Sequence, residues 1–260
     1  MRVLAVAASA LALVSPASFL RAHEVSGGGF AETNGVPSPE LTAWSVLGLA
    51  AAGTPPSDAL AYLRAHEDDL ETPTAVALVA LAEIALGDTA ESLLARLPAR
   101  PAQTNQLVWT ILALRAAHRD VPPALVRDLL SAQASSGGWS WTRRGRPDSD
   151  DTAAAIQALR AADAAGRPID RAVAFVLRHQ NRDGGFEITD GAGSNAQSTA
   201  WAMQGLVAAG RKPGRAAYRY LARLRRPDGS YRYSARYAIT PVWVTAQVLP
   251  AIAGKPFPLR

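Results

Sequence analysis

Two kinds of apolar run alternate along the chain and predict a helical repeat protein. The first, such as "SDALAYLRAH" from Ser57, is apolar on one helical face and carries Arg or Glu on the other. It is typical of a helix that packs on one side only. The second, such as "PTAVALVALAEIALG" from Pro73, is apolar nearly all round, which indicates a helix buried on most sides. Ala and Leu dominate both kinds and runs of β-branched residues are scarce, so strands are disfavoured.

The pair of runs recurs six times. The buried runs are anchored at Thr42, Thr74, Leu107, Thr152, Thr199 and Pro241, at intervals of 32 to 47 residues. Repeats of this length indicate stacked helix pairs, which form either an open solenoid or a closed double ring. Neither end carries a polar capping repeat, so we predict closure. The predicted fold is all-α, an α/α toroid (α6/α6 barrel) of six helix-pair repeats, as a single domain over residues 15–260.

The N-terminus has the layout of a short secretory signal. One Arg precedes an apolar run, and small residues follow around Ser15-Pro16. We predict a signal peptide over residues 1–14 and a secreted or cell-envelope protein. The alternative is a first core helix in a cytoplasmic protein. The run is too short for a membrane-spanning anchor, and Ser15-Pro16 is also typical of a helix start.

Composition excludes several classes of function. Lys and Arg exceed Asp and Glu by 27 to 22 without a long basic block, so we predict no nucleic-acid binding. The chain has no Cys, which excludes disulfides, thioesters and Cys-ligated zinc. The four His residues are expected at or near the ends of outer helices as helix-end caps, not as metal ligands; they are His23, His66, His118 and His179. We expect no metal and no cofactor.

Glycine-rich turns follow several outer runs. In "QASSGGW" (133–139) and "QNRDGGF" (180–186), Gly permits positive φ, the aromatic residue packs on a neighbouring repeat, and Gln can bond helix-end carbonyls. Both turns fit the Q-x-x-x-G-x-W motif, or its Phe variant, of squalene and hopene cyclases. The chain therefore resembles the terpenoid cyclase and protein prenyltransferase superfamily, whose fold is an α/α toroid. That toroid also serves zinc prenyltransferases, thioester domains and cobalamin carriers, so the resemblance specifies fold more than activity.

One acidic cluster suggests chemistry. "DSDDTA" (148–153) resembles the D-x-D-D-T-A motif of class II cyclases, which implies that Asp150 protonates an alkene or epoxide while Asp148 and Asp151 hold its geometry. Such an acid needs a raised pKa in a dry cavity with aromatic walls. Four Trp residues, each two positions after a repeat anchor, are expected to face the ring mouth, with Val76 and Ala154 in two other repeats. They are Trp44, Trp109, Trp201 and Trp243.

Four features favour a helix cap instead. A helix N-terminus stabilises ionised carboxylates, and the nearby Arg143, Arg144 and Arg146 would lower carboxyl pKa values. The other repeats also begin with polar residues, as capping requires. Finally, class II cyclases of the resembled family use two toroids, and 260 residues make one.

We therefore predict first a binding protein for a hydrophobic or bulky small molecule, isoprenoid or cobalamin-like, or for a protein partner at the ring mouth. A β domain, which cobalamin carriers pair with the toroid, would come from a second protein in trans, and membrane contact would be at most peripheral. The long loop "WSWTRRGRPDS" offers a second binding patch, formed by Trp139, Trp141, Arg143 and Arg144. The alternatives are a class II terpene cyclase using Asp148, Asp150 and Asp151, and a structural scaffold.

Overall fold

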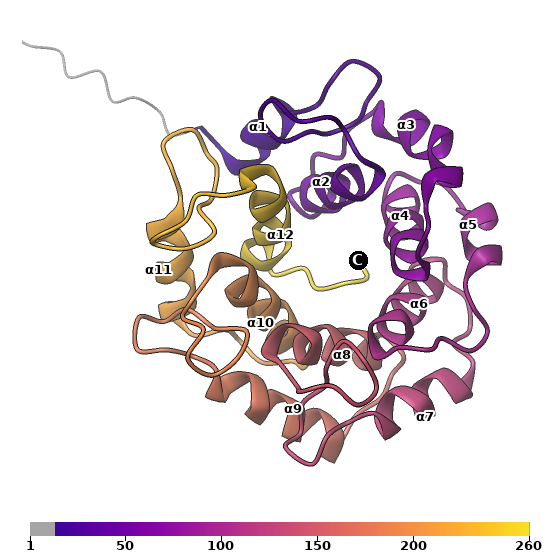
Figure 1. Ribbon diagram of the computed structural model, residues 1–260, viewed down its shortest axis with the longest axis vertical. Coiled ribbons are helices and arrows are strands. Elements are labelled where there is room, and N and C mark those ends of the chain that lie inside the picture. Colours follow the sequence, from indigo (N-terminus) through magenta and orange to yellow (C-terminus); the bar gives the residue numbers. More distant parts are fainter. Residues whose placement is uncertain (1–13, 260) are drawn as a thin grey trace, which may run out of the picture.

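Inner and outer helices alternate around a closed ring in the computed structural model, which describes residues 14–259 (Figure 1). Within this range there are twelve α-helices, a short 3-10 turn (Glu67–Asp69) and isolated β-bridges only. The inner helices are α2 (Pro39–Ala51), α4 (Pro73–Ala85), α6 (Thr104–Ala116), α8 (Ser149–Ala161), α10 (Ala196–Ala208) and α12 (Pro241–Ala253). The outer helices are α1 (Pro16–Arg21), α3 (Ala59–Ala65), α5 (Glu91–Arg96), α7 (Pro123–Ser131), α9 (Arg167–Arg178) and α11 (Arg215–Leu224).

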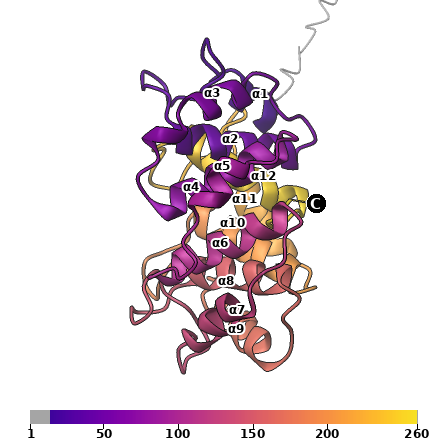
Figure 2. The same ribbon diagram turned by 90° about the vertical axis from the view of Figure 1, so that its right-hand side faces the viewer.

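The ring closes where the last inner helix meets the first. α12 packs against both α2 and α1, which closes the ring seen in Figure 1, and Figure 2 shows the same ring from its side. The predicted all-α toroid of six helix pairs is confirmed. The predicted helix start is confirmed too, because the Ser15 hydroxyl accepts the Ser18 N–H at 3.0 Å. The predicted signal peptide, apart from Val14, lies outside the described residues.

No helix among residues 14–259 combines the length and apolar character that a membrane crossing requires.

The glycine-rich turns staple neighbouring repeats together. The side-chain amide of Gln133 donates to the carbonyls of Gly137 and Pro168, both at 2.8 Å. Gln133 thus bonds one carbonyl of its own turn and one carbonyl in the first turn of α9. The predicted bond to the free carbonyls at the end of a helix is therefore wrong. Gly137 has φ +96°, and an added Cβ would lie 2.7 Å from the Arg171 carbonyl oxygen. Only glycine allows this approach of the two repeats.

Threonine hydroxyls fix the register between each turn and its inner helix. Four of them accept a backbone N–H from the residue at the end of the turn, each at 2.9 Å: Thr42 from Phe30, Thr152 from Trp139, Thr199 from Phe186 and Thr245 from Tyr231. In the sixth repeat the equivalent of Thr199 is therefore Thr245, four residues after the predicted anchor Pro241. The residue level with Trp201 is consequently Gln247, and Trp243 lies one turn nearer the mouth.

The second repeat needs a similar correction. Thr72 caps α4 as Ser38 caps α2, so the residue level with Trp44 is Leu78 and the predicted position of Val76 is wrong. Thr74 therefore lies two residues after its N-cap, whereas Thr42 lies four residues after Ser38.

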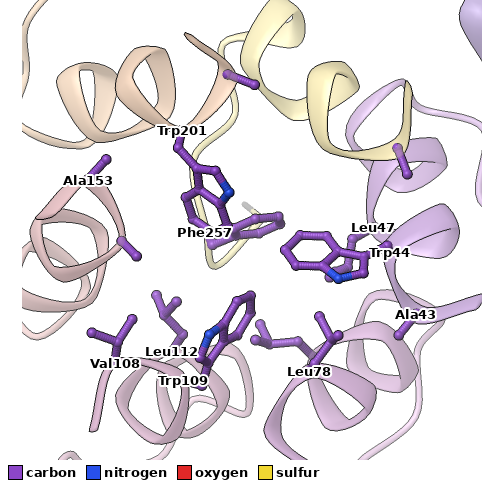
Figure 3. Packing of buried hydrophobic residues seen from close by; sticks show 14 of the residues in the cluster. Ala43, Trp44, Leu47, Leu78, Val108, Trp109, Leu112, Ala153, Trp201 and Phe257 are labelled. Atoms are coloured by element: carbon purple, nitrogen blue, oxygen red, sulfur yellow. The ribbon is translucent and has the colours of Figure 1, made fainter. Parts of the chain in front are cut away.

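The C-terminal segment fills the centre of the ring. It leaves α12 and runs into the lumen (Figure 1), where the Phe257 ring lies 6.0, 6.3 and 6.1 Å from those of Trp44, Trp109 and Trp201 (Figure 3). The Phe257 N–H donates to the Gln157 side-chain oxygen at 2.8 Å. The lumen is thus packed with protein at this level and open only beyond it.

Phe257→Ala should lower the free energy of unfolding by about 3 to 5 kcal/mol, because it leaves a cavity among three indole rings that cannot collapse together. Lys255→Ala, in the same segment but only half-buried, should change it by about 0.5 kcal/mol or less. Urea denaturation followed by circular dichroism measures both. Equal effects of the two substitutions would contradict this role of the segment.

Candidate functional site

A cavity of about 630 Å³ opens at the N-terminal ends of the inner helices. Its upper wall carries the residue two positions after the N-cap in five inner helices: Glu40, Thr74, Asn105, Asp150 and Gln197. One helical turn deeper lie the side chains that form its floor: Trp44, Leu78, Trp109, Ala154, Trp201 and Gln247. The size suits a small-molecule ligand, and the three indoles give the floor its aromatic character.

Asp148 is the N-cap of α8. Its carboxylate accepts the Asp151 N–H at 2.8 Å, as the Ser38, Thr72 and Asn195 side chains do for α2, α4 and α10. The capping prediction is therefore confirmed for Asp148. It does not extend to Asp150, whose side chain forms no capping bond and lines the cavity instead.

Asp150 is held by hydroxyl groups from two inner helices. The Ser198 hydroxyl, from the first turn of α10, donates to one carboxyl oxygen at 3.1 Å. The Ser149 hydroxyl lies 3.1 Å from the other oxygen and shares its proton with the Glu187 carbonyl, which is 2.7 Å away. Burial raises the pKa of Asp150 to about 7; the charge of Asp148 raises it as well, while the two serine bonds lower it. The carboxyl is thus close to half protonated at neutral pH.

The expectation that the helix N-terminus and nearby arginines would depress this pKa is wrong. The Arg143 guanidinium turns away and donates to the Pro101 and Ala102 carbonyls at 2.8 and 3.0 Å and to Asp128 at 3.2 Å. Arg144 and Arg146 are exposed and do not line the cavity. Desolvation of the carboxyl therefore outweighs the favourable electrostatics of the helix end.

Asp148 and Asp151 form a coupled pair beside Asp150. Burial raises the pKa of Asp151, and the charge of Asp148 adds to that rise. Burial raises the pKa of Asp148 as well, while its hydrogen bonds with Asp151 lower it. The two neighbouring carboxyl groups therefore resist being ionised together.

Five of the six predicted Trp positions meet at this cavity, together with all three Asp residues. The lining Trp residues are Trp44, Trp109, Trp141, Trp201 and Trp243. Trp141 is 53% exposed and stands at the rim beside Ile188, which is 38% exposed. Trp139 is fully buried, and its indole N–H donates to the Leu129 carbonyl at 2.7 Å. The predicted second patch is therefore divided: Trp141 lines the cavity, Trp139 is buried against α7, and Arg143 and Arg144 lie outside the cavity.

Three histidines behave as helix-end caps. The Nδ1 atoms of His23, His66 and His179 lie 2.8 to 3.0 Å from the carbonyl four residues earlier. His118 follows the inner helix α6 with φ +55°, so its predicted place on an outer helix is wrong.

Several lining residues escaped the sequence reasoning. Glu40, Asn105 and Gln197 share the position of Asp150 in their own helices, and aligning the repeats on their N-caps would have found them. Ser198 and Phe257 carried no such signal, because their contacts with the site join segments far apart in the chain.

Sequence and structure comparisons link the chain to known proteins. Residues 118–241 match the family model "Squalene-hopene cyclase C-terminal domain", and no curated protein matches the chain. The structure is similar to ent-copalyl diphosphate synthase from Streptomyces platensis, with a TM-score of 0.58, 21% identity and coverage of 85% of this chain and 52% of that one. This chain thus spans about half the length of that protein.

Two further structures cover both chains more fully. A variant of the type II terpene cyclase MstE from Scytonema, with the product merosterolic acid A, has a TM-score of 0.65 at 17% identity, covering 92% of this chain and 94% of its own. Protein geranylgeranyltransferase-I from Candida albicans has a TM-score of 0.65 at 12% identity, covering 84% and 86%. One toroid therefore accounts for nearly all of this type II terpene cyclase, whereas it accounts for about half of the Streptomyces synthase. The expected second toroid is thus not a feature of every cyclase of this type.

The match over residues 118–241 and the shared toroid confirm the predicted resemblance to the terpenoid cyclase and protein prenyltransferase superfamily, in repeat sequence and in fold.

Proposed function

We propose that this protein catalyses a class II cyclisation of a linear isoprenoid, with Asp150 as the acid. The observation that carries the proposal is the environment of one carboxyl. Asp150 retains a proton near neutral pH and faces a cavity floored by Trp44, Trp109 and Trp201. A general acid works best when its pKa lies near the operating pH.

The reaction begins when Asp150 transfers its proton to the end of the substrate. In an alkene the π electrons form the new C–H bond and leave a carbocation on the more substituted carbon. In an epoxide an oxygen lone pair forms the new O–H bond, and the C–O bond to the more substituted carbon breaks with its electron pair moving to oxygen. The next alkene attacks the cation and closes a ring. Loss of a proton to water ends the sequence, Asp150 takes up a proton from solvent, and the reaction is a net isomerisation. Indole faces on the floor attract the cation, each contact contributing about 0.5 to 2 kcal/mol.

The hydroxyls of Ser149 and Ser198 orient Asp150, and the charge of Asp148 opposes the ionisation of Asp150. These are positioning roles, because none of these groups needs to touch the substrate. The raised pKa of Asp150 favours cyclisation over simple binding. A carrier protein has no use for a buried carboxyl group that destabilises its fold.

Binding without chemistry is the second candidate, and the same cavity supports it. MstE is described with geranylgeranyl dihydroxybenzoate as substrate, and the Candida enzyme with GGPP, so isoprenoid ligands suit this type of toroid. A hydrophobic small molecule is thus common to both candidates, and turnover separates them.

Asp150→Asn should lower the rate of cyclised-product formation by about 10² to 10⁴, because the amide cannot supply the proton. Mass spectrometry of incubations with a panel of linear isoprenoids measures this. Asp170→Asn, at an exposed site on α9, is the matched control and should keep the wild-type rate. A wild-type yield from Asp150→Asn would exclude Asp150 as the acid, and no product from either protein would leave binding as the function.

Ser198→Ala should move the pH dependence of the reaction. The wild-type rate should fall as the pH rises through about 7, because Asp150 then loses its proton. The Ser198 bond lowers that pKa, so its removal should shift the fall to higher pH. Ser198→Thr, which keeps a hydroxyl, should restore the wild-type profile. A lower rate at every pH without a shift would mean that Ser198 serves only the fold.

A further inference from the structure

The cavity is lined by carboxyl groups and by no cation. Among its lining residues, all within the described chain, are Glu40, Asp148, Asp150 and Asp151, and there is no Lys, Arg or His. The whole chain carries a net charge of +5. The negative character of the cavity is therefore local and opposite in sign to that of the protein.

The cations in nearby loops do not compensate this charge. Arg143 is bonded to Pro101, Ala102 and Asp128, and Arg232 donates to the carbonyls of Ser234 and Ala235 at 3.3 and 3.0 Å. Arg144, Arg146 and Arg236 are exposed, and none of them lines the cavity.

The remaining polar groups of the cavity suit an uncharged ligand. Gln247 is 2% exposed, lies on the cavity floor, and its side-chain oxygen has no hydrogen-bond partner. A buried carbonyl oxygen without a partner is costly, and a ligand hydroxyl would satisfy it. Asn105 and Gln197 add neutral amides at the upper wall.

We infer that the site takes a polyprenyl substrate with an uncharged head, such as an alcohol, phenol, epoxide or plain hydrocarbon, and rejects polyprenyl diphosphates. The inference rests on the proposed isoprenoid function and specifies its substrate class. A diphosphate in this cavity would lie among four carboxyl groups with no cationic side chain beside it. Any of these groups that is ionised would repel the diphosphate strongly in a partly desolvated site. The expected substrate thus differs from the diphosphate named for the Streptomyces and Candida proteins.

Geranylgeraniol and geranylgeranyl diphosphate test this directly, because they differ only in the head group. Quenching of the Trp fluorescence gives the dissociation constant of each, at pH 8, with and without Mg²⁺. The alcohol should bind more tightly than the diphosphate by about tenfold or more. Equal or tighter binding of the diphosphate, in either condition, would overturn the inference.

A charge reversal locates the effect. Glu40→Lys should strengthen diphosphate binding by about tenfold and change alcohol binding by about twofold or less. Asp170→Lys makes the same change in net charge at an exposed site in the first turn of the outer helix α9, away from the cavity lining. It should change the binding of neither ligand. Equal gains from both substitutions would show that overall charge, not the cavity, sets the preference.

The binding measurements and the turnover measurements test the head-group inference and the proposed reaction separately. Alcohol binding without cyclised product would sustain the head-group preference and reject the proposed reaction. If neither compound binds to the wild type, the inference is overturned, because the cavity then takes no polyprenyl chain of this length.

Discussion

Ring closure is the constraint on which the site depends. Each outer helix returns the chain to the same end of the molecule, so all six inner helices begin at one mouth. Their first turns then face one another across a space wide enough for a ligand. A residue two positions after the N-cap would be fully solvated on an isolated helix, whereas here it lines the wall of a cavity.

This constraint explains the opposing influences on Asp150. The end of α8 supplies backbone dipoles and two hydroxyl donors that favour the carboxylate, and enclosure by the ring favours the neutral acid more strongly. The raised pKa means that the folded chain binds more protons than the unfolded chain. Its contribution to stability is fully present below about pH 4 and is lost as the pH rises through about 7. At neutral pH the protein thus tolerates a group that opposes folding, which is typical of a functional site.

The C-terminal segment supports the cavity floor. The Phe257 ring packs against the rings of Trp44, Trp109 and Trp201 inside the lumen. With it, the three indoles form a supported floor one helical turn below Asp150. The distance between Asp150 and the indole floor is therefore set by the fold. In the proposed reaction this arrangement would bring the cationic part of the substrate against aromatic faces.

The sequence was sufficient for the helices, the six repeats and the caps, because burial and turn chemistry leave local patterns. The depth of each side chain along the ring axis was harder to predict from the sequence. In the sixth repeat the residue equivalent to Thr199 is Thr245 and not the anchor Pro241. The state of Asp150 was out of reach, because its burial depends on α10, whose Ser198 lies 48 residues away in the chain. Phe257 was missed for the same reason, as an aromatic residue in a short tail gives no sign of where the tail goes.

The most direct test of the account is the pKa of the Asp150 carboxyl in the folded protein. Carbon-13 NMR of aspartate-labelled protein, titrated between pH 4 and 9 and assigned with Asp150→Asn, measures it. The account predicts a value of about 7. A value near 4, the ordinary range of an exposed aspartate, would mean that the carboxylate is ionised and solvated, and the acid role would be contradicted.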